Sequence, residues 1–204
     1  MCLKMSATGV VEQQVKYFML TGVPGVGKTT LIKKICDILS KNGVSQKGYY
    51  TEELRNASKR VGFDVVTLNG ERGPLARIDT GSGRFKVGRY NVLIESFENL
   101  VLPIFNNLQQ SSCPVLVIDE IGKMELFSKN FQKKVEEVFK SDQLILGTVP
   151  SASSDQLVRK IKTNPRTRVI EVTHSNRNDL AQTIASDILS VLNYPKEAMF
   201  VREK

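Results

Sequence analysis

The sequence predicts an α/β protein with a mainly parallel sheet, helices on both faces, and an added antiparallel β segment. Two observations predict the parallel part. Short apolar segments of strand length alternate with amphipathic segments of helical spacing, and this alternation is typical of crossover units. A Gly-rich turn also joins the first strand to the first helix. The third observation concerns residues 61–94, where short apolar stretches are separated by turn signals such as Asn69-Gly70 and Gly73-Pro74.

The N-terminal half contains the first strand, the first helix and the antiparallel segment. Residues 16–21 are apolar enough for a buried strand, and residues 29–40 have apolar side chains at helical spacing. Residues 48–51 form a second short strand. After the antiparallel segment, Ser96 is a candidate N-cap of a helix that reaches about Gln109. Pro103 should kink this helix or mark a later start.

The C-terminal half alternates regularly. The pattern predicts one folded domain over residues 15–193, with a flexible tail at residues 1–14 and a second tail at 194–204. The antiparallel insertion occupies about residues 61–94 of that domain. The expected strands are 115–119, 144–149 and 168–173, and the expected helices are 129–140, 155–162 and 180–192.

Composition excludes several classes of protein. The 204 residues are 41% hydrophobic and carry 29 basic and 21 acidic side chains, which is an ordinary globular balance with a net charge of +8. No apolar run approaches the ~18–20 residues of a membrane helix, and no secretory signal is evident. Three isolated cysteines and one histidine predict no structural zinc site. We therefore expect a cytoplasmic monomer without membrane contact, and access to the nucleus is not ruled out by the sequence.

The strongest motif is the Gly-rich turn between the first strand and the first helix. Its residues fit the Walker A pattern G-x-x-x-x-G-K-[ST] in the structural context that the pattern requires. Glycines let backbone N–H groups approach phosphate oxygens, and Lys28 should reach the β- and γ-phosphates. The Thr29 hydroxyl should bind Mg²⁺. The predicted nucleotide-binding residues here are Gly22, Val23, Pro24, Gly25, Val26, Gly27, Lys28, Thr29 and Thr30.

The second motif is a pair of carboxylates after the buried strand 115–119. In open α/β sheets, ligands bind at the carboxyl ends of the strands. Asp119 should therefore hold Mg²⁺ together with Thr29, and Glu120 should orient or deprotonate an attacking water. Lys28 and Glu120 are thus the predicted catalytic residues, and Mg²⁺ is the predicted cofactor. Glu120 as an ordinary surface residue is the alternative.

Several blocks together resemble the cancer-related nucleoside-triphosphatase family, which includes the thermophilic archaeal and bacterial nucleoside-triphosphatases. The resemblance spans about residues 16–192 and implies a RecA-like P-loop fold in three layers. It also implies slow, Mg²⁺-dependent hydrolysis of several nucleoside triphosphates, ATP, GTP, CTP and UTP among them, to the diphosphate and phosphate. The blocks are Gly22 to Thr30, Gly48-Tyr49-Tyr50-Thr51-Glu52-Glu53, Gly62 to Val66, Arg72-Gly73-Pro74-Leu75, Asp119-Glu120-Ile121-Gly122-Lys123-Met124-Glu125-Leu126, Leu146 to Pro150, Val172-Thr173 and Asn176-Arg177.

The segment after the last predicted strand is a candidate base-binding region. Asn176 and Arg177 are predicted to bind nucleotide there, with Arg177 stacking on a base or stabilising γ-phosphate charge. Asn176, Asn178 or Asp179 serves equally well as an N-cap of the following helix.

Weaker candidates have roles that the sequence leaves open. Thr148 could sense the γ-phosphate or be a core threonine, and arginines of the insertion could form a phosphate-contacting lid or an exposed face. These weaker candidates are Glu52, Glu53, Arg72, Arg77, Arg84, Arg89, Lys123, Thr148 and His174.

Two other functions use the same motifs. A kinase that transfers the γ-phosphoryl group to a nucleoside, a nucleotide or another small acceptor needs the same phosphate site plus an acceptor pocket. A nucleotide-dependent switch with RNA contacts is suggested by residues 1–60, which are more basic than the rest of the chain. No nucleic-acid-binding motif supports it.

Overall fold

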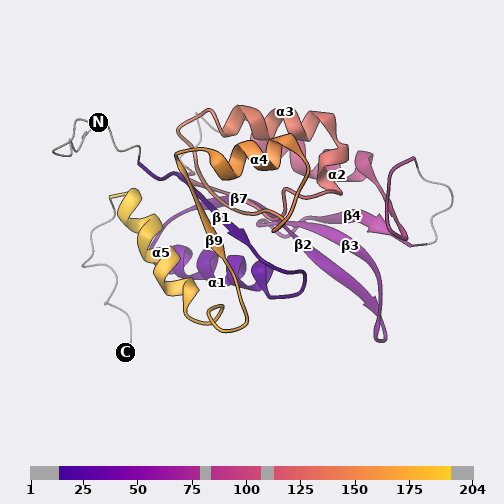
Figure 1. The fold of residues 1–204 in the computed structure, drawn as a ribbon, viewed down its shortest axis with the longest axis horizontal. Helices are drawn as coiled ribbons and strands as arrows, with labels where there is room; N and C mark the ends of the chain where they lie inside the picture. Colours follow the sequence, from indigo (N-terminus) through magenta and orange to yellow (C-terminus); the bar gives the residue numbers. More distant parts are fainter. Residues whose placement is uncertain (1–13, 79–83, 107–112, 194–204) are drawn as a thin grey trace.

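The computed structural model describes residues 14–78, 84–106 and 113–193. Within these residues, one nine-stranded sheet in the order β5-β6-β4-β3-β2-β7-β8-β1-β9 is covered by helices on both faces (Figure 1). The predicted three-layer α/β architecture is therefore confirmed. Both predicted tails lie outside the described residues, apart from Gln14.

The parallel half of the sheet is short and deeply buried. All residues of β1, β7 and β8 are buried, because helices cover both of their faces. The parallel pairs run β2–β7, β7–β8, β8–β1 and β1–β9. The strands are β1 (Tyr17–Thr21), β2 (Gln46–Asn56), β7 (Val115–Ile118), β8 (Leu144–Thr148) and β9 (Thr167–Glu171).

The antiparallel half begins inside β2, which is longer than the predicted strand 48–51. Its first residues pair in parallel with β7, and from Tyr49 onward it pairs antiparallel with β3. Tyr49 pairs with Ile118 on one side and with Thr67 on the other. The antiparallel strands are β3 (Lys59–Thr67), β4 (Arg72–Arg77), β5 (Lys86–Val87) and β6 (Tyr90–Val92).

Five helices form the outer layers of the part of the chain that the structure describes. One face carries α1 (Lys28–Lys41) and α5 (Leu180–Val191) (Figure 1). The other face carries α2 (Ile94–Val101), α3 (Lys129–Val138) and α4 (Gln156–Thr163). Short 3₁₀ turns η1 (Leu102–Phe105) and η2 (Glu125–Phe127) follow α2 and precede α3.

Alternating side chains of the buried strands supply two hydrophobic cores. In β1, Tyr17 and Met19 pack with α2, α3 and α4, whereas Phe18 and Leu20 pack with α1 and α5. The same alternation holds along β7. The sheet is therefore held from both faces, and the loops at the carboxyl ends of its strands rest on a rigid base.

The predicted helix after the antiparallel segment is partly wrong. Ser96 does not cap it: α2 begins at Ile94, Leu93 is the N-cap, and no side chain caps the first turn. The helix ends at Val101 rather than near Gln109, because Pro103 has no N–H for helical hydrogen bonding and lies at the start of η1. Residues 107–112, into which the prediction extended, lie outside the described residues.

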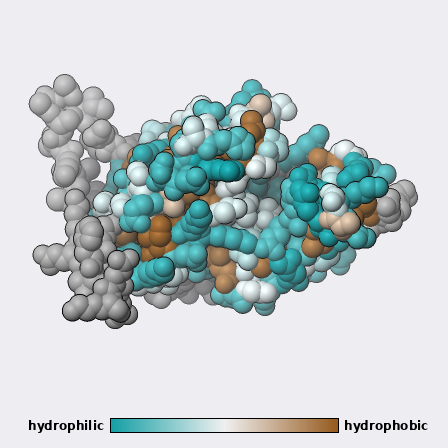
Figure 2. Space-filling view, turned by 90° about the horizontal axis from the view of Figure 1, so that it is seen from below, coloured by the Kyte–Doolittle hydropathy of each residue, from teal (hydrophilic) through white to brown (hydrophobic). Residues whose placement is uncertain are grey.

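The helices found in the described residues are too short or too polar to cross a membrane. The face shown in Figure 2 is mostly hydrophilic, and its hydrophobic residues form small, separate patches. Scattered patches of this kind are ordinary for the surface of a globular domain.

Candidate active site

The loop between β1 and α1 turns at three glycines in left-handed conformations. Gly22, Gly25 and Gly27 all have positive φ values, which favour glycine. At Gly22, a Cβ would lie 2.4 Å from the carbonyl oxygen of Val172, so no side chain fits there. The loop is therefore pressed against the end of β9, and its N–H groups lead into the N-terminus of α1.

Lys28 folds back over this loop. Its Nζ donates to the carbonyl oxygen of Gly22 at 3.0 Å and to that of Val23 at 3.4 Å. Thr29 is half-buried beside Lys28, and Thr30, Val23, Pro24 and Gly25 are exposed. The structure thus gathers the predicted loop residues into one turn with the lysine ammonium above it.

Asp119 lies at the carboxyl end of β7 and is 1% exposed. Its Oδ1 accepts a hydrogen bond from the Thr148 hydroxyl at 2.6 Å, whereas its Oδ2 is buried and has no hydrogen-bond partner among the described residues. Burial raises the pKa of the Asp119 carboxyl, and the hydroxyls of Thr148 and Thr29 and the charge of Lys28 oppose that rise. A buried carboxylate oxygen without a partner is costly unless a cation or donor satisfies it.

These residues fit a bound Mg²⁺. The unpartnered Oδ2 of Asp119 and the Thr29 hydroxyl are hard oxygen donors, which Mg²⁺ prefers. The structure holds no group of three or more His, Cys, Asp or Glu side chains suited to a metal, as far as its described residues extend. Two protein donors are nevertheless the usual number for a nucleotide-bound Mg²⁺, because phosphate oxygens and waters supply the rest.

Glu120 follows directly, half-buried at the same edge of the sheet. Its backbone oxygen accepts a hydrogen bond from the hydroxyl of Tyr49 at 3.2 Å. Burial and the neighbouring Asp119 raise the pKa of Glu120, and Lys28 lowers it. The side chain therefore lies within the field of both the Asp119 carboxylate and the Lys28 ammonium.

Sequence reasoning missed one functional candidate, Glu125 in η2. This carboxyl is 4% exposed, and its Oε2 accepts a hydrogen bond from the N–H of Gly122 at 3.2 Å. Burial, Glu120 and Asp119 together raise the pKa of Glu125 to about 8. The available signal was its place in the Asp119–Leu126 block, between the apolar residues Met124 and Leu126.

The side chains of the two residues predicted to bind the base have different partners. The Asn176 side chain is used within its own turn: Oδ1 accepts from the Thr173 N–H at 2.8 Å, and Nδ2 donates to the Glu171 carbonyl at 2.9 Å. Arg177 is exposed, and its Nη1 donates to the carbonyl oxygen of Val26 at 3.2 Å. Asp179 is the N-cap of α5 but makes no side-chain capping bond. Arg177 is therefore the one of the two with a side chain beside the phosphate loop.

Two acids within β2, Glu52 and Glu53, and the arginines of the antiparallel half pair with each other. Glu52 pairs with Lys33 of α1 at 2.5 Å and also with Arg72. Asp64 pairs with Arg72 at 3.0 Å and with Arg77 at 2.5 Å. Glu53 pairs with Arg55 and Arg60, Arg89 donates to the Arg60 carbonyl, and the Arg84 guanidinium lies 5.3 Å from the centroid of the Phe85 ring.

Of the remaining candidates, Thr148 is a fully buried hydroxyl that donates to Asp119. Lys123 and His174 are exposed.

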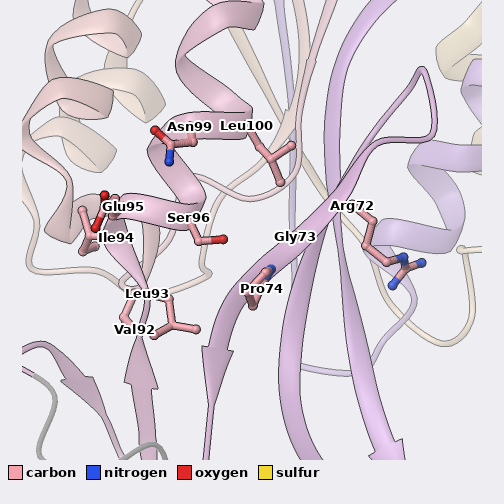
Figure 3. Close-up of a pocket in the computed structure, with 10 residues that line it drawn as sticks. All are labelled: Arg72, Gly73, Pro74, Val92, Leu93, Ile94, Glu95, Ser96, Asn99 and Leu100. Carbon is pink, nitrogen blue, oxygen red and sulfur yellow. The ribbon is translucent and has the colours of Figure 1, made fainter.

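A cleft of about 710 Å³ opens between β4, β6 and the first turns of α2 (Figure 3). Its walls are mixed, with apolar side chains such as Pro74 and Leu100 and polar ones such as Ser96 and Asn99. The Arg72 guanidinium points away from α2 in Figure 3. The volume is within the range of small-molecule sites.

Comparison with known proteins identifies the family. A sequence model of the family described as NTPase matches residues 17–185. The human protein named cancer-related nucleoside-triphosphatase is 45% identical over 185 residues, which cover 86% of this chain and 97% of the human one. Nucleoside-triphosphatase THEP1 of Thermotoga maritima is 42% identical over 176 residues, which cover 86% and 95% of the two chains.

The same holds in three dimensions. The crystal structure of THEP1 from Aquifex aeolicus matches with a TM-score of 0.74 at 34% identity, over 83% of this chain and 97% of that one. The resemblance seen in the sequence is thus confirmed. With its Gly-rich phosphate loop, its buried Asp119 and this shared fold, the chain belongs to the NTPase family of P-loop nucleoside-triphosphatases.

Proposed function

We propose that this chain hydrolyses ATP, GTP, CTP and UTP to the diphosphate and phosphate, slowly and with Mg²⁺. Family membership supports hydrolysis of nucleoside triphosphates. The observation that carries the finer proposal is the meeting of three groups at one edge of the sheet. These are the phosphate loop with Lys28, the Asp119 carboxylate with its unpartnered oxygen, and Glu120.

Each group has a separate task. The loop N–H groups and Lys28 hold the β- and γ-phosphate oxygens and stabilise the charge that develops on them. Thr29 and Asp119 would hold Mg²⁺, which would neutralise charge on the same oxygens. Glu120 orients a water and accepts its proton as the water oxygen bonds to the γ-phosphorus. The bond from that phosphorus to the bridging oxygen breaks, which releases the diphosphate.

Broad base acceptance is supported by the surroundings of the loop. The polar atoms of the Asn176 side chain already bond to backbone, so they are not free to read one base. Arg177 is exposed, and a guanidinium can stack on any base because every base has an apolar face.

Phosphate release from the four triphosphates, with and without Mg²⁺, tests the proposal. We expect Lys28→Ala to abolish turnover, and Glu120→Gln to lower kcat by ~10²–10⁴-fold while the nucleotide dissociation constant stays near that of wild type. Glu98→Gln is a matched control, because Glu98 accepts hydrogen bonds from Ser128 and Asn130 away from the loop. Wild-type kcat in Glu120→Gln would remove Glu120 from the mechanism.

The cleft of Figure 3 favours a second candidate function, transfer of the γ-phosphoryl group to a small acceptor. The arginines that a kinase lid would need are instead engaged: Arg72 and Arg77 both pair with Asp64. A panel of nucleosides, nucleotides and other small hydroxyl compounds separates the two functions. Consumption of triphosphate beyond the phosphate released would identify a kinase.

We also propose that the enzyme is a monomer, that it is cytoplasmic, and that it needs no nucleic acid for turnover. Sedimentation measures the oligomeric state. RNA binding whose affinity falls steeply as the salt concentration rises would instead support the nucleotide-dependent switch.

A further inference from the structure

Two glutamate side chains in the Asp119–Leu126 segment converge on one glycine. A Cβ placed on Gly122 would lie 2.5 Å from Oε1 of Glu120 and 3.0 Å from Oε2 of Glu125. Both carboxyl oxygens therefore lie within 3.0 Å of one point in space. A side chain at residue 122 would separate the two carboxyls, so glycine at this position allows them to share that space.

Glu125 is fixed in this position by its backbone as well as by its carboxyl. Its Oε2 accepts from the Gly122 N–H at 3.2 Å, and its carbonyl oxygen accepts from the Ser128 N–H at 3.0 Å. The Leu126 N–H in turn donates to the Gly122 carbonyl at 3.0 Å. Hydrogen bonds therefore join the turn that carries Glu125 to Gly122, which lies between Glu120 and Glu125 in the sequence.

The charged and titratable groups around Glu125 favour its neutral form. Glu120 and Asp119 are the acids that act on it, and burial is the largest cause of its pKa of about 8. The buried Tyr49 phenol is also near, and its own pKa is raised well above the usual value by burial, Glu125, Asp119 and Glu120. Lys28, the nearby cation, acts on Asp119 and Glu120. Burial and the two neighbouring acids therefore favour the protonated form of Glu125.

We propose that Glu125 is a positioning residue: its carboxyl donates a hydrogen bond to the Glu120 carboxyl beside Gly122 and fixes the orientation in which Glu120 meets the attacking water. The inference rests on the proposed role of Glu120. No proton leaves Glu125 in the reaction, because the proton of the water goes to Glu120. The Gly122 N–H holds Oε2 of Glu125 in place on the same side of Gly122 as Oε1 of Glu120.

Steady-state kinetics of two variants test this role. We expect Glu125→Ala to lower kcat by ~10–100-fold, because a misplaced base loses its alignment with the water, while KM and nucleotide affinity stay within about twofold. Glu125→Gln should restore most of kcat, since its amide both accepts from the Gly122 N–H and donates to Glu120. Glu137→Gln, a change of the same kind on the exposed face of α3, should behave as wild type.

The pH profile separates positioning from a structural role. In wild type, kcat should fall above about pH 8 as Glu125 loses its proton and its donor. Glu125→Gln cannot lose that donor, so its profile should lack this alkaline fall. A folded Gln variant that keeps the wild-type fall overturns the proposal, and this holds even if the Ala variant fails to fold. Wild-type kcat in Glu125→Ala also overturns it.

The double variant distinguishes failure of this inference from failure of the proposed function. Glu125→Ala should add little further loss to Glu120→Gln, because both act on one step. If Glu120→Gln is inactive but Glu125→Ala is fully active, only the positioning role fails. If Glu120→Gln turns over at the wild-type rate, the proposed function of Glu120 fails first.

Discussion

The two halves of the sheet treat charged side chains in opposite ways. In the parallel half, Asp119, Glu120 and Glu125 lie together, and no basic side chain of the described residues pairs with any of them at salt-bridge distance. Burial raises the pKa of each. In the antiparallel half, Glu52 is flanked by Lys33 and Arg72, whose hydrogen bonds lower its pKa. The carboxylates without a basic partner thus lie in the candidate active site, whereas the paired ones connect the antiparallel strands.

The two buried aspartates give the sharpest form of this comparison, since one lies in each half. Asp119→Asn should lower kcat by ~10²–10³-fold, because the proposed Mg²⁺ ligand is lost. The melting temperature should not fall. Asp64→Asn should leave kcat near wild type but cost ~1–3 kcal/mol, because it loses charge-assisted hydrogen bonds to Arg72 and Arg77. Phosphate release and thermal melts of both variants measure the contrast. Equal effects of the two changes on kcat would break it.

A variant of Thr148 tests whether the hydrogen bond that Thr148 donates to Asp119 matters for activity. Thr148→Val removes the hydroxyl that donates to Asp119 at 2.6 Å and keeps the shape of the side chain. Activity or Mg²⁺ affinity should fall by ~10–100-fold, the usual effect of losing a residue that orients a metal ligand. Thr167→Val is the matched control, since the buried Thr167 hydroxyl has no hydrogen-bond partner. A titration of activity against Mg²⁺ concentration gives the result, and identical curves for the two variants would contradict it.

The protonation of Glu125 predicts a pH-dependent gain in stability. The folded chain keeps this proton up to about pH 8, whereas the unfolded chain releases it near pH ~4.3. The free energy of unfolding of the wild type therefore falls as pH rises through this window. Glu125→Gln removes this loss, because the amide has no proton to release. The melting temperature of the variant should exceed that of wild type more at pH 8.5 than at pH 5, with ~2–4 °C for each kcal/mol. A difference that does not change with pH would show that Glu125 is ionised when folded.

The smallest effect is expected at the arginines. Arg72→Gln should leave kcat unchanged and cost less than ~1 kcal/mol, because Arg72 is partly exposed and Glu52 keeps its pair with Lys33. Chemical denaturation and phosphate release measure both quantities. A fall in kcat of ~10³-fold or more would instead identify Arg72 as an arginine finger, and the antiparallel half would then belong to the chemistry.

Much of the fold and the site was predictable, because their signals are local in sequence. A phosphate loop needs glycines and a lysine at fixed spacing, and a buried strand that ends in Asp119 is apolar without interruption. The start of α2 was not predictable in this way, since its first turn carries no side-chain cap. The role of the Asn176 side chain depends on contacts with Thr173 and Glu171 that only the folded turn creates.

Glu125 was missed for a different reason. In the sequence, an acid between apolar neighbours indicates an exposed position on a short helix. The burial of Glu125 depends instead on the packing of α2 and α3 over η2. The pairing of Arg72 with both Glu52 and Asp64 likewise depends on the register of β2, β3 and β4.

β2 belongs to both halves of the sheet, and this gives the molecule a mechanical property. Its eleven residues span ~36 Å as one strand, from its contact with β7 to the hairpin that projects from the body in Figure 1. Near the inner end, the Tyr49 hydroxyl holds the backbone oxygen of Glu120. A load applied at the hairpin tip, by a binding partner or by an attached probe, would therefore pass along the strand to Tyr49 and the backbone of Glu120.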